Sequence, residues 1–169
     1  MYCFEPNKSF NPYIKKIGKN ISIHNYAFGD KTEIKKLFLN NIDLTNSLSE
    51  INENSYYLKI KNLITQKSKK KIFRKIKVLT LKNFCKQKKI KKIDLLKIDV
   101  EGYEYMVLLG AKDFLRKIDY IMLEIQKNDM YKNYSNAKIE KLLEKNNFKL
   151  IKRFNFPFMF FQDRIYKKI

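Results

Sequence analysis

Four acidic residues have the positions best suited to chemistry in this sequence. Glu5, Asp99, Glu101 and Glu124 each lie in or at the end of a short apolar run. A carboxylate can accept hydrogen bonds from two hydroxyls at once, and it can take a proton from a hydroxyl within hydrogen-bond distance. Because burying an unpaired carboxylate costs several kcal/mol, acids inside otherwise apolar runs indicate a function.

Lys97 is the basic residue nearest to this chemistry. It precedes Asp99 by two residues, so both side chains lie on the same face of an expected strand and can form an ion pair. Such a pair would keep Asp99 ionised. The structural alternative is that Lys97, Asp99 and Glu101 form a polar network that orients the turn after the strand. We interpret the single histidine, His24, as a strand-face residue rather than a base.

Apolar runs and turn residues predict the elements that position these side chains. We expect strands near 2–4, 21–27, 34–39, 75–81, 93–100, 120–125, 148–153 and 164–169. We expect helices over 8–17, 81–92, 103–109 and 136–147, with Asn7 and Ser135 as N-caps and Gly110 as a C-cap. Residues 29–31 suit a hairpin or a tight connection, and the apolar run at 93–100 suits a buried parallel strand.

Strands that alternate with helices predict an α/β fold. Open parallel sheets bind ligands at the carboxyl ends of their strands. The acids that end the expected strands should therefore lie on one edge of the sheet. The 169 residues suit one domain, with a polar and basic excursion at about 40–75.

The net charge of +20 is concentrated in one block. Of the 37 basic residues 33 are Lys, and residues 59–92 hold 15 basic residues and no acid. The block raises the alternative of a nucleic-acid-binding protein, with Phe73 and Phe84 as stacking residues. The scarcity of Arg disfavours it, because base and phosphate recognition relies on the bidentate Arg fork.

Composition also excludes several classes of protein. Two cysteines, Cys3 and Cys85, cannot build a disulfide framework or a metal site by themselves. No apolar run reaches the roughly 20 residues that span a membrane, and the N-terminus lacks the pattern of a signal peptide. We therefore expect no membrane span, no metal ligands and a cytoplasmic location.

Several motifs together resemble the FkbM-type methyltransferases, which use S-adenosylmethionine. The central one is Asp-Leu-Leu-Lys-Ile-Asp-Val-Glu-Gly-Tyr-Glu at 94–104, which continues through Leu-Leu-Gly-Ala at 108–111. The others are Phe-Glu-Pro-Asn at 4–7, His-Asn-Tyr-Ala-Phe-Gly-Asp-Lys at 24–31 and Tyr-Ile-Met-Leu-Glu-Ile at 120–125. The motifs appear in family order and extend over most of residues 1–150.

The resemblance implies a fold and a set of roles. The fold would be a Rossmann-like class I methyltransferase sheet with helices on both faces. Glu5 would bind the ribose hydroxyls, and the loop after the next strand would lie along the adenine. The implied cofactor-binding residues are Glu5, Asn7, Ala27, Phe28, Asp30 and Asp99, and the implied catalytic residues are Lys97, Asp99 and Glu101. The acceptor would be a hydroxyl of a sugar or another small metabolite.

The resemblance also implies elements that this sequence lacks. In the family a first strand, a Gly-rich turn and a first helix precede the strand that corresponds to residues 2–4, so the chain resembles an N-terminally truncated member. We expect a fragment of a longer enzyme, or a start from a misassigned codon. The alternatives are a decayed remnant and a shortened form that completes its sheet with a partner, such as a second copy in a homo-oligomer. The functional alternative is a nucleic-acid-binding or non-catalytic interaction domain on a decayed methyltransferase scaffold.

Overall fold

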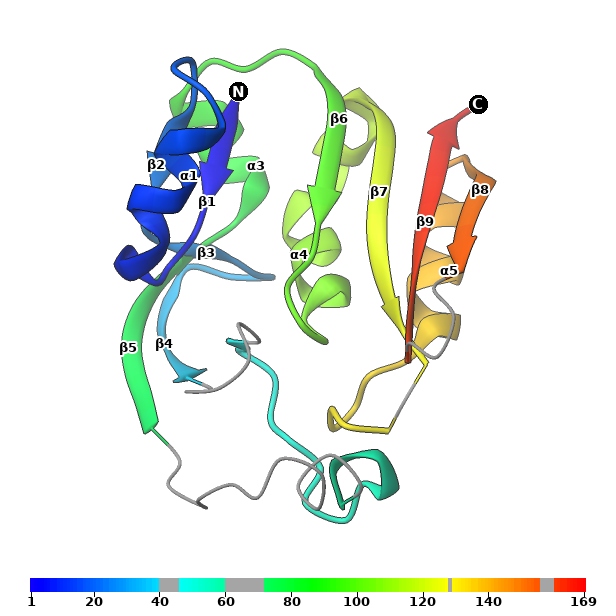
Figure 1. The fold of residues 1–169 in the computed structure, drawn as a ribbon. Coiled ribbons are helices and arrows are strands. Elements are labelled where there is room, and N and C mark those ends of the chain that lie inside the picture. The colour runs from blue at the N-terminus through cyan, green and yellow to red at the C-terminus, as the bar shows by residue number, and fades with distance from the viewer. Residues whose placement is uncertain (40–45, 60–71, 128, 156–159) are drawn as a thin grey trace.

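The computed structural model describes residues 1–39, 46–59, 72–127, 129–155 and 160–169 (Figure 1). The strands are β1 (Tyr2–Phe4), β2 (Ser22–His24), β3 (Ala27–Phe28), β4 (Glu33–Leu39), β5 (Ile72–Leu79), β6 (Ile93–Ile98), β7 (Ile118–Gln126), β8 (Phe148–Asn155) and β9 (Phe161–Lys168). The helices are η1 (Lys8–Phe10), α1 (Asn11–Ile17), α3 (Leu81–Gln87), α4 (Glu104–Ala111), η2 (Lys112–Lys117) and α5 (Asn136–Lys145). An α/β fold is confirmed, and none of the described helices has the length and apolarity needed to cross a bilayer.

The described strands form three sheets rather than the single sheet expected. β1 pairs in parallel with β2, and the second sheet has the order β3-β5-β4. The third sheet has the order β6-β7-β9-β8, in which β6 and β7 are parallel and β9 runs antiparallel to both of its neighbours. The arrows of β1, β6 and β7 point the same way in Figure 1, so their carboxyl ends face the same side.

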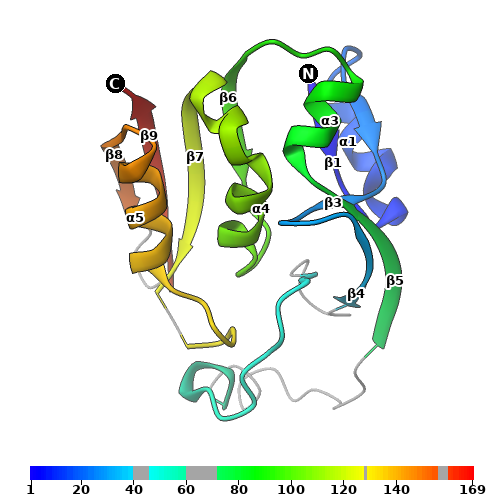
Figure 2. The ribbon, with the colours of Figure 1, turned by 180° about the vertical axis from the view of Figure 1, so that it is seen from behind.

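The parallel strand expected at 93–100 is present as β6, but the expectation that it is buried is wrong. Among the described strands β6 pairs with β7 alone, so it is an edge strand. Leu95 is 57% exposed, whereas Ile98 is buried. In Figures 1 and 2, α4 and α5 lie on the same side of this sheet, and the fully buried Ile121, Leu123 and Ile125 of β7 form its core.

Residues 29–31 form a tight connection and not a hairpin. β3 pairs in parallel with β5, and β5 separates β3 from β4. The strand expected at 75–81 also ends earlier, at Leu79, because the Thr80 hydroxyl accepts a hydrogen bond from the Asn83 amide and caps α3.

The N-caps are where the sequence predicts them. The Asn7 side chain accepts from the Ser9 amide at the start of η1, and the Ser135 hydroxyl accepts from the Lys138 amide at the start of α5. Pro12 lies in the first turn of α1, where its missing N–H costs nothing.

Six aromatic rings pack between the β1–β2 sheet and α3. They belong to Tyr2, Phe4, His24, Tyr26, Phe28 and Phe84. Phe84 lies at the centre of the cluster and is only 2% exposed. It cannot stack on a nucleic-acid base, so the structure removes one of the two stacking residues of the nucleic-acid alternative.

Gly110 is not the C-cap of α4, because the helix continues through it to Ala111. Its role is close packing against the turn that follows β3. A Cβ atom at position 110 would overlap the carbonyl oxygen of Gly29, which is backbone and cannot rotate away. Glycine is therefore required where α4 meets the Gly29 turn.

Gly110→Ala should destabilise the protein, because α4 or the Gly29 turn must move to accept the methyl group. We expect a loss of about 1–3 kcal/mol in the free energy of unfolding, the usual cost of overpacking. Gly18→Ala is the matched control, since its Cβ would meet only the Ile21 side chain at 3.8 Å. Thermal denaturation followed by circular dichroism compares the two, and equal melting temperatures would contradict the packing role.

Candidate functional site

Three of the acids singled out in the sequence meet at the carboxyl ends of β6 and β7. Oxygen atoms of Asp99, Glu101 and Glu124 all lie within 4.8 Å of one another. Glu5 follows β1 in a different sheet, on the side toward which β6 and β7 also point (Figure 1). We call Asp99, Glu101 and Glu124 the acidic trio.

The ion pair between Lys97 and Asp99 is present. Lys97 Nζ lies 2.7 Å from Asp99 Oδ2, and both side chains are about half exposed. Burial opposes the charge of Lys97, but the hydrogen bond and the negative charge of Asp99 outweigh it and raise the Lys97 pKa. At this exposure the pair contributes little to stability, so its effect is to place one positive charge beside the trio.

The acidity of Glu124 is strongly perturbed. Burial, followed by the charges of Asp99 and Glu101, raises its pKa to about 7. Its Oε1 accepts a hydrogen bond of 2.8 Å from the Gln126 side chain. Three carboxylates at this separation could share one cation. The sequence predicts no metal ligands, because it places these acids on one edge of the sheet without showing how closely their oxygen atoms approach.

The turn that carries Asp99 and Glu101 is held by the side chain of Glu104. Glu101 and Gly102 both have positive φ angles, of 52° and 87°. Glu104 Oε1 accepts hydrogen bonds from the amides of Val100 (3.3 Å) and Gly102 (3.1 Å). These bonds fix the turn, so they also fix the direction in which the Asp99 and Glu101 side chains leave it.

Glu104 holds the turn with a carboxyl group that is buried and only partly hydrogen-bonded. The side chain is fully buried, and its Oε2 has no hydrogen-bond partner among the described residues. Burial raises the Glu104 pKa to about 8, although the amides of Gly102 and Val100 act in the opposite direction. The sequence motif at 94–104 includes Glu104 but indicates no role for it.

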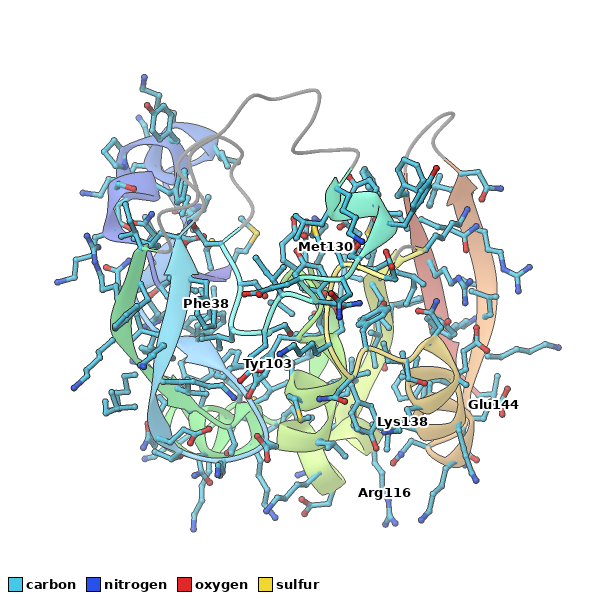
Figure 3. All side chains as sticks on the ribbon, turned by 90° about the horizontal axis from the view of Figure 1, so that it is seen from below. Phe38, Tyr103, Arg116, Met130, Lys138 and Glu144 are labelled. Carbon is cyan, nitrogen blue, oxygen red and sulfur yellow. The ribbon has the colours of Figure 1, made fainter. Side chains whose placement is uncertain are left out.

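The described part of the polar excursion closes over this turn. Ser47 Oγ donates to the Glu101 carbonyl at 2.5 Å, and Ser49 Oγ donates to the Gly102 carbonyl at 2.7 Å. Figure 1 shows this cyan segment at the edge to which β6 and β7 point, and Figure 3 views the same edge from below. The sequence predicts limited regular structure here and gives neither serine a function.

The connection between β7 and α5 supports the turn from another side. The Tyr131 hydroxyl donates to Glu101 Oε2 at 2.7 Å, and its ring lies 2.5 Å from the position that a Cβ atom at residue 102 would take. Ser55 Oγ and the Tyr56 amide bind the two carboxylate oxygens of Asp129 at 2.6 and 3.0 Å. The excursion and this connection therefore form one hydrogen-bonded wall beside the trio.

Glu5 is oriented by its neighbours. The Asn7 amide donates to Glu5 Oε1 at 2.7 Å, and the Asn25 side chain donates to the Glu5 carbonyl at 2.8 Å. Burial raises the Glu5 pKa, and the hydrogen bond from Asn7 partly offsets this. Hydroxyl donors from a ligand would stabilise the ionised form of such a half-buried carboxylate.

The remaining expected site residues lie around β3. Ala27 and Phe28 form that strand, and the Phe28 ring packs on Phe4 with centroids 4.4 Å apart. Asp30 is half-buried in the turn that follows. His24 lies on β2 with its ring stacked on Phe4, as expected for a strand-face residue.

Comparison with protein families identifies the methyltransferase FkbM domain over residues 1–150. The match spans β1 through the start of β8, including Glu5 and the acidic trio, and the chain therefore belongs to the FkbM methyltransferase family. The family resemblance drawn from the sequence motifs is confirmed, and with it a methyltransferase domain that would need a methyl donor. Comparisons with curated proteins and with solved structures find no match.

Glu104→Gln should change how stability depends on pH. Folding raises the Glu104 pKa from 4.5 to about 8, so the protonated form favours the fold. This contribution is complete below about pH 4.5 and is lost as the pH rises toward 8. Glutamine keeps an oxygen acceptor and does not ionise, so the melting temperature of Glu104→Gln should rise relative to the wild type from pH 5 to pH 8.

The exposed Glu144→Gln on α5 serves as the control, since a change of charge there should leave the pH dependence of melting unaltered. If the melting curves of Glu104→Gln and the wild type shift in parallel across this range, Glu104 does not titrate as described.

Proposed function

We propose that this protein is an S-adenosylmethionine-dependent methyltransferase that acts on a hydroxyl of a sugar or another small metabolite. The observation that supports it is the acidic trio, which gathers at the carboxyl ends of two parallel strands in a chain of the FkbM family. Ligands of open α/β sheets bind at that edge.

The proposed domain covers residues 1–169 and has the Rossmann-like arrangement of class I methyltransferases. In this proposal the β1–β2 sheet and the β6-β7-β9-β8 sheet are two parts of one sheet. Two observations support this arrangement. β1, β6 and β7 run in the same direction, and the antiparallel β9 lies between β7 and β8 (Figures 1 and 2).

Glu5 is the proposed ligand of the cofactor's ribose. Its carboxylate is held by the Asn7 amide and is half-buried, which suits a group that binds two hydroxyls at a protected position. Ala27, Phe28 and Asp30 are proposed to lie along the adenine. S-adenosylmethionine supplies a methyl group on a positively charged sulfur, and the negative trio is complementary to that charge.

Asp99 is proposed to accept the proton of the acceptor hydroxyl. It is about half exposed, so an acceptor can reach it, and Lys97 provides a positive charge at 2.7 Å. Glu101 is proposed to position the acceptor, since Tyr131 and the backbone of the turn fix its carboxylate. Most of the rate acceleration in such a site comes from alignment, which the rigid turn favours.

Glu5→Ala should weaken S-adenosylmethionine binding by about 1–3 kcal/mol, the cost of losing hydrogen bonds to a charged group. Isothermal titration calorimetry measures the dissociation constant. Glu144→Ala removes an exposed carboxylate of α5 and should bind like the wild type. Equal affinities of Glu5→Ala and the wild type would refute the ribose assignment.

Asp99→Asn should abolish methyl transfer, because the amide cannot take the proton. Cofactor affinity should change little, because Glu101 and Glu124 of the trio remain. Turnover of a panel of sugar and small-metabolite hydroxyls, followed by release of S-adenosylhomocysteine, measures the loss. Asp94→Asn on the same strand is the matched control. If Asp99→Asn retains turnover and Glu124→Gln loses it, Glu124 is the base instead.

A further inference from the structure

The β4–β5 pair has an outer face that the proposed methyl transfer does not use. Residues directly opposite in an antiparallel pair share a face, and the register pairs Ile34 with Lys77, Lys36 with Lys75, and Phe38 with Phe73. We call these six residues the β4–β5 outer face. The opposite face packs inward, with Leu37, Ile76 and Val78 buried.

The charged side chains on this face are all lysines, and two of them are directly opposite each other across the strands. Lys36 and Lys75 are exposed and directly opposed across the strands, and Lys77 lies on the same face two residues further along β5. Like charges in such cross-strand positions are destabilising, and none of the six residues is acidic. Three ammonium groups without an acid on the same face are complementary to a surface that carries several negative charges.

Apolar side chains accompany these lysines. Ile34 is 66% exposed and Phe73 is 48% exposed. Lys36 Nζ lies over the Phe73 ring, 4.6 Å from its centroid, so a cation and an aromatic ring form one unit at the surface. Figure 1 places β4 and β5 on the opposite side of the molecule from β8 and β9, and the exposed Ile34 and Phe73 leave this face open to contact.

We propose that the β4–β5 outer face binds the surface of an anionic lipid bilayer. Lysine ammonium groups attract anionic headgroups, and neighbouring apolar side chains enter the boundary between headgroups and acyl chains. The protein would thus meet its acceptor at a membrane surface without spanning the bilayer.

The same observations disfavour nucleic acid as the occupant. Proteins that bind single strands stack bases on open aromatic faces. Here Lys36 lies over the Phe73 ring, and Phe84, the other aromatic residue of the basic block, is buried in the core. The exposed aliphatic Ile34 offers nothing to a base or a phosphate, but it suits a lipid boundary.

Vesicle co-sedimentation tests the proposal. The full chain should sediment with vesicles of phosphatidylcholine containing about 30% phosphatidylglycerol, and not with pure phosphatidylcholine. Each lysine near an anionic surface strengthens binding about fivefold, so Lys36→Gln/Lys75→Gln/Lys77→Gln should weaken it by about 100-fold. The matched control is Lys138→Gln/Lys141→Gln/Lys145→Gln, which removes three exposed lysines of α5.

A second pair of variants tests the apolar contribution. Ile34→Ser/Phe73→Ser should weaken vesicle binding by about tenfold, the loss expected for part of two buried side chains. Leu95→Ser/Ile151→Ser, which changes two residues of other strands that are 57% and 52% exposed, should have no effect.

Three outcomes would overturn the proposal. The first is that the wild type does not sediment with anionic vesicles. The second is that the α5 triple variant loses as much vesicle binding as the outer-face triple variant. The third is that the chain binds a single-stranded oligonucleotide through the three outer-face lysines but does not bind vesicles. Calorimetry with S-adenosylmethionine separates the two proposals, because the outer-face variants should keep their cofactor affinity. A wild-type chain that binds vesicles but no cofactor would count against the methyltransferase assignment alone.

Discussion

The candidate site depends on how the backbone from Val100 to Tyr103 is held. Its amides donate to Glu104, and its carbonyls accept from Ser47 and Ser49. Gly102 adopts a positive φ angle where any side chain would meet the Tyr131 ring. Because donors and acceptors are satisfied on both sides, the turn has one geometry, and the acids that leave it are fixed in direction. A buried carboxylate with one unpaired oxygen is the cost of this rigidity.

Charge is separated between two parts of the molecule. The acidic trio lies at the ends of β6 and β7, where Lys97 is its nearest described counter-charge, and the opposed lysines lie on β4 and β5. Each cluster of like charges is unfavourable alone, and a ligand of opposite charge would relieve it. The net charge of +20 is therefore less informative than its distribution.

Local signals in the sequence predict most of the elements but not their pairing. Asn7, Thr80 and Ser135 each cap a helix through a residue two or three positions ahead, so caps can be located from sequence, although the alternating pattern places Thr80 within a strand. Gly110 has the local pattern of a helix end, and only the distant Gly29 carbonyl explains it. The apolar run of β6 indicates burial, but burial depends on how many strands lie beside it. The acids of the site are predictable as strand ends, whereas Ser47, Ser49 and Tyr131 reach the turn through tertiary contacts that no local pattern records.

The hydrogen bonds of the wall beside the trio join residues far apart in the chain. Ser47 and Glu101 are separated by 54 positions, and Ser55 and Asp129 by 74. Closing such long loops costs entropy that local contacts do not, and chains rich in remote contacts fold slowly. Helices α3 and α4 can form from neighbouring residues, but the excursion can dock only after β6, α4 and the β7–α5 connection are in place. We therefore expect assembly of the site to be a late step of folding.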